Sequence, residues 1–425
     1  MSPLLFALFL ATFAIGTTEF AVVGLLPDIA AGLGASISQT GLLVSGYAIG
    51  VAIGGPVIVA LTSSQPRKRT LLQLCAIFVV GHALAALAPD YGWLMGARVL
   101  AAVSHASFLG IAAIVAAGSV PPERSARAVS FVWLGFSAAS LVGVPSATAI
   151  GHAFGWRAPF WMLAAVGVIA GAALQLWMPE SSRSGAASFR QEVVALRRPQ
   201  VLLAMAMCLL VCASTFAVFT YVAPLLLEDT GISVGALPLM LLLFGVGGAA
   251  GMVIGGRLGD WKPLESVAVL SLAYAVFYLV LMAVIESAAL VGAAMILWGF
   301  LFLAPCVPLQ TRVVRKAIDG PNLASTLNQS AFNVGNALGP TLGAAALSLG
   351  FDYRALPWIG SALALLCAAT AHFSHTLDRG EPVPVADVAS QRASVRELWA
   401  DLTRKASTRF DFERRTRFHF GAPDV

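Results

Sequence analysis

Charged residues are scarce in this chain of 425 residues. Asp, Glu, Lys and Arg together make up only 11% of it, while 58% of the residues are hydrophobic. Soluble proteins carry about 25% charged residues, and so large an apolar surplus does not fit inside a water-soluble core. The surplus must face lipid, which predicts an integral membrane protein. The net charge of +5 is spread between apolar runs and forms no long basic face, so nucleic-acid binding is not expected.

Several signatures of soluble chemistry are also missing. No G-x-x-x-x-G-K-[ST] sequence is present, which argues against ATP-driven transport by this chain alone. No nucleophile or metal cluster is visible, so we expect neither an enzyme nor a cofactor. The first twenty residues lack a basic n-region and an A-x-A site, which predicts a first span rather than a cleaved signal peptide. The cysteines lie inside apolar runs without metal spacing and are expected to pack as small hydrophobes, without metal or disulfide. They are Cys75, Cys208, Cys212, Cys306 and Cys367.

Twelve apolar runs are each long enough, at about 20 residues, to cross a bilayer as a helix. They lie at 4–27, 39–62, 70–89, 93–118, 127–151, 158–178, 200–227, 235–257, 266–285, 288–311, 323–349 and 355–376. Strands of a membrane barrel would give only about ten residues with alternating polarity. The sequence therefore predicts an all-α integral membrane protein with twelve transmembrane helices.

The basic residues of the short loops orient these spans. One side of the membrane receives fourteen of them: Arg67, Lys68, Arg69, Arg124, Arg127, Arg183, Arg190, Arg197, Arg198, Arg257, Lys262, Arg312, Arg315 and Lys316. The other side receives only Arg157 and Arg354. Because Lys and Arg accumulate in cytoplasmic loops, the richer side and both termini are expected to be cytoplasmic.

The two sets of six spans resemble each other. Pro145 and Pro340 lie in similar Gly-rich segments, and Arg157 and Arg354 close matching outer loops. The repeat predicts two pseudo-symmetric six-helix bundles, 1–178 and 200–376, with a cavity between them at mid-depth. Residues 179–199 would form a cytoplasmic linker and 377–425 a cytoplasmic tail. Within that tail, residues 394–406 have the pattern of a short amphipathic helix on the inner leaflet.

Ionisable residues inside a span are functional candidates, because burying them in the membrane is costly. Glu19 in the first span and Arg98 in the fourth lie at a similar depth, roughly 9–12 Å below the outer boundary. Burial favours the neutral form of a carboxyl group and a nearby arginine favours its charged form. A change in the surroundings could thus move a proton on and off Glu19. The alternative is a static ion pair. His82 is expected to be a packing residue.

A set of aromatic and amide side chains could line a substrate site, and each could equally pack in the core or join helices. The candidates are His105, Phe20, Tyr47, Phe108, Trp133, Tyr221, Trp298, Asn328 and Asn333. His105 follows Arg98 by seven residues and therefore shares its helical face. The eleventh span, which contains both asparagines, is unusually polar.

The chain resembles the major facilitator superfamily, and within it the twelve-span drug:proton antiporters similar to arabinose-efflux-like and chloramphenicol-resistance exporters. The resemblance covers about residues 1–376 and rests on GTTEFAVVGLLPDIA (16–30), RVLAAVSHASFLG (98–110), GVPSATAIGHAFGWRAPFW (143–161), FTYVAPLL (219–226) and NQSAFNVGNALG (328–339). It implies that Gly143, Pro145 and Gly151 form the antiporter motif of the fifth span. It also implies that Glu19 and Arg98 occupy the acidic and basic motif positions of the first and fourth spans.

One part of the family pattern is altered. The loop motif G-x-x-x-D-R-x-G-R-[RK] has Val59, Ser63 and Pro66 in place of its first Gly, its Asp and its second Gly. Only the closing pair, Arg67 and Lys68, remains. The second half of the chain keeps Asp260, so gating could depend more on that half.

These observations predict a monomeric exporter in a bacterial inner membrane that exchanges entering protons for a small solute. The solute could be a chloramphenicol-like antibiotic, a sugar or a related metabolite. The protein's partners would then be protons, this solute and the lipid bilayer. The alternatives are an importer or facilitator of sugars or nucleosides, and a non-transporting receptor or a channel. A channel would need a continuous polar pore, for which the spans offer too few polar residues.

Overall fold

The structure is a computed structural model, and it describes residues 2–62, 65–121, 124–179, 198–317 and 321–380. Met1–Ser374 form one compact unit and His375–Val425 a second. The predicted tail helix at 394–406 lies outside the described residues, and so does the predicted linker at 179–199 except for its first residue and its last two. The same holds for Ser63 of the altered loop motif.

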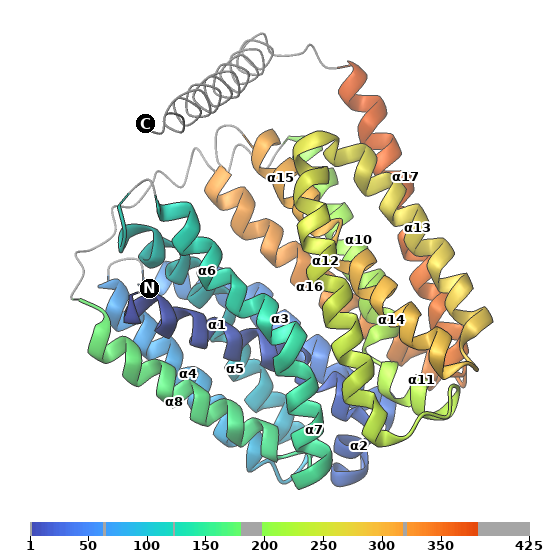
Figure 1. Ribbon diagram of the computed structural model, residues 1–425, viewed down its shortest axis with the longest axis horizontal. Coiled ribbons are helices and arrows are strands. Elements are labelled where there is room, and N and C mark those ends of the chain that lie inside the picture. Colours follow the sequence, from blue (N-terminus) through green and yellow to red (C-terminus); the bar gives the residue numbers. More distant parts are fainter. Residues whose placement is uncertain (1, 63–64, 122–123, 180–197, 318–320, 381–425) are drawn as a thin grey trace, which may run out of the picture. The chain divides into compact units, whose positions relative to one another are not determined.

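The regular structure of the described residues is helical. The first half of the chain forms α1 (Pro3–Ala21), η1 (Val23–Leu25), α2 (Leu26–Leu33), α3 (Ile37–Thr62), α4 (Arg67–Ala86), α5 (Tyr91–Gly118), α6 (Ser125–Ala138), η3 (Ala139–Gly143), α7 (Val144–Phe154) and α8 (Ala158–Trp177). The second half forms α10 (Pro199–Phe219), α11 (Val222–Glu228), η4 (Val234–Ala236), α12 (Leu237–Trp261), α13 (Pro263–Val284), α14 (Ala288–Leu303), α15 (Cys306–Lys316), α16 (Pro321–Ser348), η5 (Tyr353–Ala355) and α17 (Leu356–Gly380). We call α1 to α8 the N-terminal half, and α10 to α17 as far as Ser374 the C-terminal half. The helices of each half lie together in Figure 1.

Eleven helical segments of the described residues are long and apolar enough to cross a membrane. Their ends agree with the predicted runs to within a few residues. The remaining predicted span is α16, whose 28 residues are long enough but include four asparagines, a glutamine and several small hydroxyl residues. It packs against α3 and α10, so part of its polar surface meets protein instead of lipid. Together these helices form the predicted all-α membrane fold.

The helix ends repeat at a constant spacing, as the internal repeat requires. Pro3 and Pro199, Arg67 and Pro263, and Ser125 and Pro321 begin corresponding helices, each pair 196 residues apart. The backbone repeats as well. Gly34 and Gly231 end the short helices α2 and α11 with φ of 62° and 68°, and Gly155 and Gly350 follow α7 and α16 with φ of 89° and 88°. A left-handed backbone favours glycine at such helix ends.

Several spans are interrupted instead of continuous. The first span ends its regular helix at Ala21 and continues through η1 and α2, and α10 breaks in the same way before α11. The fifth span contains η3, a five-residue π-helix, directly before Pro145. A π-helical turn and a proline both bend helices. The interruptions therefore give these spans bends beside the interface between the halves.

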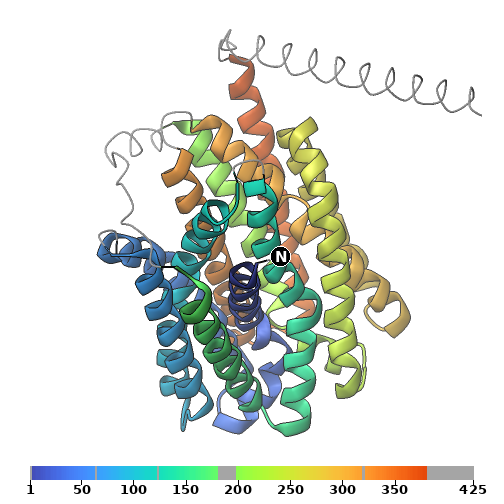
Figure 2. The same cartoon turned by 60° about the vertical axis from the view of Figure 1, so that its left-hand side comes forward.

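Large apolar side chains are exposed on the outward faces of many helices. Examples are Trp161 and Leu176 on α8 and Val269 and Leu272 on α13. A soluble monomer rarely exposes contiguous apolar area on this scale. By contrast, α1 is largely buried, and in Figure 2 it is viewed almost end-on with other helices around it. The outward faces are therefore suited to contact with lipid, and α1 lies in the interior of the helical bundle.

The two halves meet along α3 and α16, and again where η3 and α7 pack against α12. Further contacts join η1 and α2 to α11, and α7 to η4. All but the first of these involve helices near the end that holds Gly34, Gly155, Gly231 and Gly350, which we call the outer end because the loop charges predict that it faces outward. In the described residues, α6 reaches the opposite half through Ser137, whose hydroxyl lies 3.5 Å from Sδ of Met252, and neither α6 nor α15 makes a contact of comparable extent. Apart from the contact between α3 and α16, the halves are thus packed together mainly toward the outer end.

Candidate functional site

Glu19 lies two residues before the end of α1 and reaches the boundary between the halves. The residue is buried at 7% exposure, and it is the only buried acidic residue among those that the structure describes. Asn336 of α16 donates a hydrogen bond from Nδ2 to Oε1 of Glu19 over 3.0 Å. Because the two residues are 317 positions apart in the chain, this bond joins the first span to the eleventh.

His105 and Tyr47 extend the polar cluster into the N-terminal half. His105 Nε2 lies 4.0 Å from Oε2 of Glu19, and its Nδ1 lies 3.2 Å from the hydroxyl of Tyr47. Both side chains are about 1% exposed. The structure therefore places two predicted binding residues, from α5 and α3, around the predicted proton site.

Arg98 is fully buried beside this cluster. Its Nη1 donates to the main-chain oxygen of Thr18 over 2.8 Å and to the Thr18 hydroxyl over 3.1 Å. Its guanidinium lies over the ring of Tyr47 at 4.2 Å, a cation–π contact. No nitrogen of Arg98 comes within 4.0 Å of a Glu19 oxygen in the described structure. Arg98 is thus near Glu19 but is bonded to the preceding residue.

His82 takes part in the same network, although the sequence suggested only packing. Its Nδ1 lies 2.7 Å from the carbonyl oxygen of Phe78 and its Nε2 lies 2.6 Å from the Thr18 hydroxyl. A carbonyl oxygen only accepts, so Nδ1 carries the proton and a neutral ring accepts the Thr18 hydroxyl at Nε2. The Thr18 hydroxyl then accepts a hydrogen bond from Arg98 and donates one to His82. This arrangement holds α1, α4 and α5 in register around Glu19.

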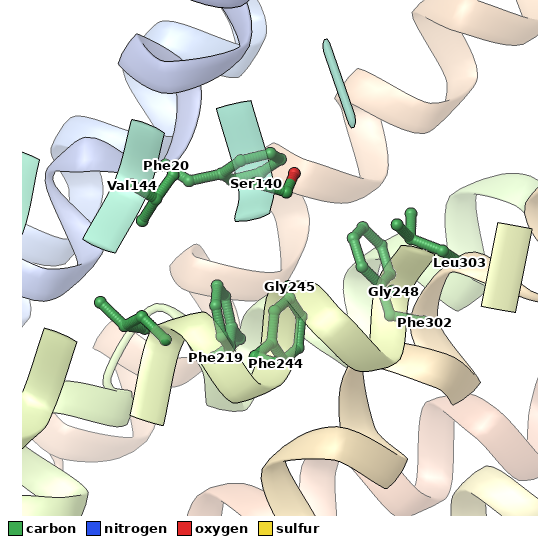
Figure 3. Close-up of a pocket in the computed structure, with 10 residues that line it drawn as sticks. Phe20, Ser140, Val144, Phe219, Phe244, Gly245, Gly248, Phe302 and Leu303 are labelled. Carbon is green, nitrogen blue, oxygen red and sulfur yellow. The ribbon is translucent and has the colours of Figure 1, made fainter. Parts of the chain in front are cut away.

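A small cavity lies between the two halves and is lined by Phe20, the residue that follows Glu19 in the chain (Figure 3). Its walls carry four phenylalanines, and its single hydroxyl belongs to Ser140. The lining residues are Phe20, Ser140, Val144, Phe219, Leu241, Phe244, Gly245, Gly248, Phe302 and Leu303. In Figure 3 the side chains of Phe20 and Val144 come from one half and those of Phe219 and Phe244 from the other. The cavity measures about 20 Å³, space for about one water molecule, so a solute fits only after the halves rearrange.

Of the predicted aromatic residues, only Phe20 lines this cavity, and the others lie behind its wall or in other parts of the protein. Trp298 lies behind the wall, in an edge-to-face contact with Phe219, and its Nε1 donates a hydrogen bond to the Tyr274 hydroxyl. Tyr221 is buried near the outer end and donates to the carbonyl oxygen of Pro340. The other two lie elsewhere: Phe108 borders a second small cavity inside the N-terminal half, and Trp133 is 37% exposed beside Phe136.

The two asparagines predicted to bind solute make contacts within the C-terminal half. Asn328 donates from Nδ2 to Oε1 of Gln310 over 2.5 Å, and Asn333 donates to the carbonyl oxygen of Gln329 in its own helix. Their Oδ1 atoms are buried and accept no hydrogen bond from described residues. Neither asparagine is among the residues that line the cavity beside Phe20.

The glycines of the fifth span allow α7 and η3 to lie close to α1. A Cβ atom on Gly143 would collide with Thr17 and Phe13, and one on Gly151 would collide with Leu25. Pro145 occupies the first turn of α7, directly after the π-helix. These three residues are therefore packed at the bend of the fifth span.

The charged residues that the sequence predicts for gating lie at the opposite end of the spans. Asp260 ends α12 and comes within 4.0 Å of Arg315 on α15, with the aspartate side chain 88% exposed. Exposed ion pairs of this kind contribute about 0–1 kcal/mol. Arg67 and Lys68 begin α4. Asp260 and Arg315 thus meet within the C-terminal half.

The family model of the Major Facilitator Superfamily matches residues 8–325. The chain belongs to the major facilitator superfamily. It is therefore a multi-pass membrane transporter and not an enzyme, as expected from the sequence.

Relatives within the superfamily include named transport proteins. The chain is 39% identical over 362 residues to "Inner membrane transport protein YdhP" of Escherichia coli (strain K12), covering 85% of this chain and 93% of that protein. It is 35% identical over 349 residues to "Chloramphenicol resistance protein" of Streptomyces lividans, covering 81% and 88%. The structure matches the "Crystal structure of D-xylose-proton symporter" with a TM-score of 0.71 and 17% identity, covering 87% of this chain and 96% of that chain. The last match supports the fold alone.

Proposed function

We propose that this transporter exports a small, weakly polar aromatic solute in exchange for entering protons. Glu19 carries the proton, and Arg98, Tyr47 and His105 hold its surroundings. The solute binds next to Glu19 where the aromatic cavity opens. The protein works as a monomer in a bacterial inner membrane with both termini cytoplasmic, as two six-helix bundles joined by the linker at 179–199.

The isolation of Glu19 is the observation that carries the proton assignment. It is the only buried acidic residue among those that the structure describes, and it sits at the interface that must open and close. A buried carboxylate has lost its hydration, so the balance between its charged and neutral forms depends on the protein groups around it and shifts when they move. Contact with a moving partner therefore links proton uptake to conformation.

The distribution of contacts between the halves supports alternating access. The halves are packed mainly toward the outer end, and α6 and α15 make no contact of comparable extent with the opposite half. Opening the outer contacts and closing the inner ones would expose the same cavity to the other side. The bends at η3 and after α1 and α10 give the spans places at which to move.

The chemistry of the cavity favours an aromatic solute over a sugar. Phenylalanines supply stacking and edge contacts for a flat ring. A sugar hydroxyl buried against them without a partner would lose about 1–3 kcal/mol, and only Ser140 offers a hydroxyl in return. Efflux is named in one relative at 31% identity, "Probable sugar efflux transporter" of Mannheimia succiniciproducens, and the name of the chloramphenicol resistance protein is compatible with export. The first name makes a sugar the alternative outcome of the test.

The coupling is tested in proteoliposomes under an imposed pH gradient, with chloramphenicol as the first probe. Glu19→Gln keeps the size and the acceptor oxygen but cannot exchange a proton, so gradient-driven transport should stop. Asp28→Asn is the matched control, because Asp28 lies on α2 only nine residues later, is partly exposed and contacts His152 at 3.4 Å. It should retain coupled transport. Gradient-driven transport that survives Glu19→Gln unchanged would refute the proton assignment.

Substrate and direction are tested together in an efflux-deficient bacterial host. Expression should raise resistance to compact aromatic antibiotics and leave sensitivity to sugars unchanged. Any compound that passes is then followed in vesicles of both orientations. Accumulation in inverted vesicles supports export, whereas uptake by right-side-out vesicles would establish an importer.

A further inference from the structure

The amide group of Asn336 uses its donor side but not its acceptor side. Nδ2 donates to Glu19, but Oδ1 is buried and accepts no hydrogen bond from any described residue. A buried acceptor that lacks a hydrogen bond lowers the stability of the protein relative to the same acceptor with one. The unsatisfied oxygen belongs to the same planar amide that faces the carboxyl group of Glu19.

The protonation state of Glu19 decides whether Oδ1 can be satisfied. An ionised carboxylate only accepts hydrogen bonds, so it can serve Nδ2 and leaves Oδ1 alone. A neutral carboxyl group also donates through its O–H. It can then accept from Nδ2 and donate to Oδ1, which forms a cyclic pair of two hydrogen bonds. The contact between α1 and α16 is therefore stronger when Glu19 carries a proton.

We propose that Asn336 is the positioning residue through which the C-terminal half senses the proton on Glu19. This inference rests on the proposed role of Glu19. Proton binding tightens the contact between the first and eleventh spans and favours the conformation whose outer end is closed. Loss of the proton weakens the contact and leaves the outer end free to open. The order suits an exchanger, since a proton taken from outside closes the side from which it came.

Other titratable groups face Glu19 from the N-terminal half. Arg98 is bonded to Thr18 through Nη1, and His105 is joined to Tyr47 through Nδ1, while its Nε2 lies 4.0 Å from Glu19, beyond hydrogen-bond distance. Cys212 of α10 lies within electrostatic range of Glu19. The remaining helices packed on α1 bring Arg127, at the distant start of α6, and His152, next to Asp28; α8 and η3 contain no charged residue. Asn336 is the residue whose hydrogen bond links Glu19 to the opposite half.

The inference is tested without a substrate by measuring how proton concentration changes the outer end. Spin labels replace Phe154 at the end of α7 and Val234 in η4, two exposed residues on elements that contact each other across the halves. Of the native cysteines, Cys306 is partly exposed and is changed to Ser, while the other four are buried. The label distance is recorded at acidic and alkaline pH in nanodiscs.

In the otherwise unchanged protein, acid should increase the closed population roughly tenfold, as expected for one additional buried hydrogen bond. Asn336→Leu and the smaller Asn336→Ala should abolish this response, and Asn336→Gln, which keeps the amide, should retain part of it. Ser330→Ala is the matched control, because Ser330 also bonds from α16 to the N-terminal half, through the carbonyl oxygen of Ala52. It should leave the pH response intact.

The outcomes separate the two proposals. A full pH response in both Asn336→Leu and Asn336→Ala overturns the role of Asn336, as does loss of the response in Ser330→Ala. If the response persists in Glu19→Gln, the proton site itself is wrong. If Glu19→Gln abolishes the response while the Asn336 variants keep it, the proposed function stands and this inference fails. A starting protein without any pH response overturns the inference as well.

Discussion

Arg98 donates a hydrogen bond over 2.8 Å to the main-chain oxygen of Thr18, the residue that precedes Glu19. The bond ties the fourth span to the first at the depth of the proposed proton site. The same guanidinium stacks on Tyr47, whose hydroxyl lies 3.2 Å from His105. Arg98 therefore fixes the backbone and the walls around Glu19, and its charge acts on Glu19 from a short distance without a direct ion pair.

Replacing Arg98 should damage both stability and transport. Arg98→Ala removes the charged donor that bonds to Thr18 and contacts Tyr47, and each hydrogen bond to a charged group contributes about 1.5–3 kcal/mol. Arg98→Lys keeps the charge, but a lysine cannot reproduce the planar contact with Tyr47 while bonding to Thr18, so partial function is expected. Thermal unfolding in detergent and gradient-driven transport in proteoliposomes measure the two effects.

Arg157 provides a matched control for this experiment. It also donates to a main-chain oxygen, that of Ala88, and its guanidinium lies 4.1 Å from the ring centre of Trp156. It is only partly buried and lies away from Glu19. Arg157→Ala should therefore cost less stability and leave coupling intact. Equal losses of transport in the two alanine variants would show that Arg98 has no special role near the proton site.

The positions of the spans could be predicted from the sequence because hydropathy and length alone determine them. The match extends to the broken first span, whose predicted run at 4–27 covers α1, η1 and the start of α2. The repeat was also visible, through features such as Pro145 and Pro340. Only α16 is less apolar than the other spans. Its polar residues are accommodated because they contact other helices, as Asn336 does through its bond to Glu19.

The partners inside the membrane could not be predicted in the same way. Depth along a helix follows from residue number, and it brought Glu19 and Arg98 to the same level. Direction around the helix axis changes by about 100° per residue, so depth cannot distinguish Thr18 from Glu19 as the partner of Arg98. Likewise Phe219, Phe244 and Phe302 lie in spans that are apolar on every face. Nothing in such a sequence marks the face that lines a cavity.

Packing at the outer end should control the balance between the two conformations. A Cβ atom on Gly245 of α12 would approach Ser140 O to 2.6 Å and Leu141 Cα to 2.9 Å in the opposite half. Gly245→Ala therefore overpacks the closed outer end at a cost of about 1–3 kcal/mol, which would move the populations roughly 5- to 150-fold towards the open form. The label pair at positions 154 and 234 should report a longer distance.

Gly256 lies on the same helix and gives the control. A Cβ atom there meets no atom within 4 Å, so Gly256→Ala adds a methyl group without a clash and slightly favours the helix. Its distance distribution should match that of the unchanged protein. If Gly245→Ala gave the same distribution, the contact between α12 and η3 would not hold the outer end closed.

The aromatic wall of the cavity should determine the affinity for the exported solute. Phe244 lines the cavity and stacks on Phe219 with ring centres 4.1 Å apart. Burying a ring against a phenylalanine side chain contributes about 1.5–3 kcal/mol, so Phe244→Ala should raise the solute concentration for half-maximal transport roughly 10- to 150-fold. Phe277 is equally buried but contacts Tyr274, Tyr278 and Trp298 away from the cavity lining. Phe277→Ala should lower the unfolding temperature to a similar extent while leaving that concentration unchanged. A similar increase in both variants would mean that the loss reflects general loosening of the core, and the solute would then have to bind elsewhere.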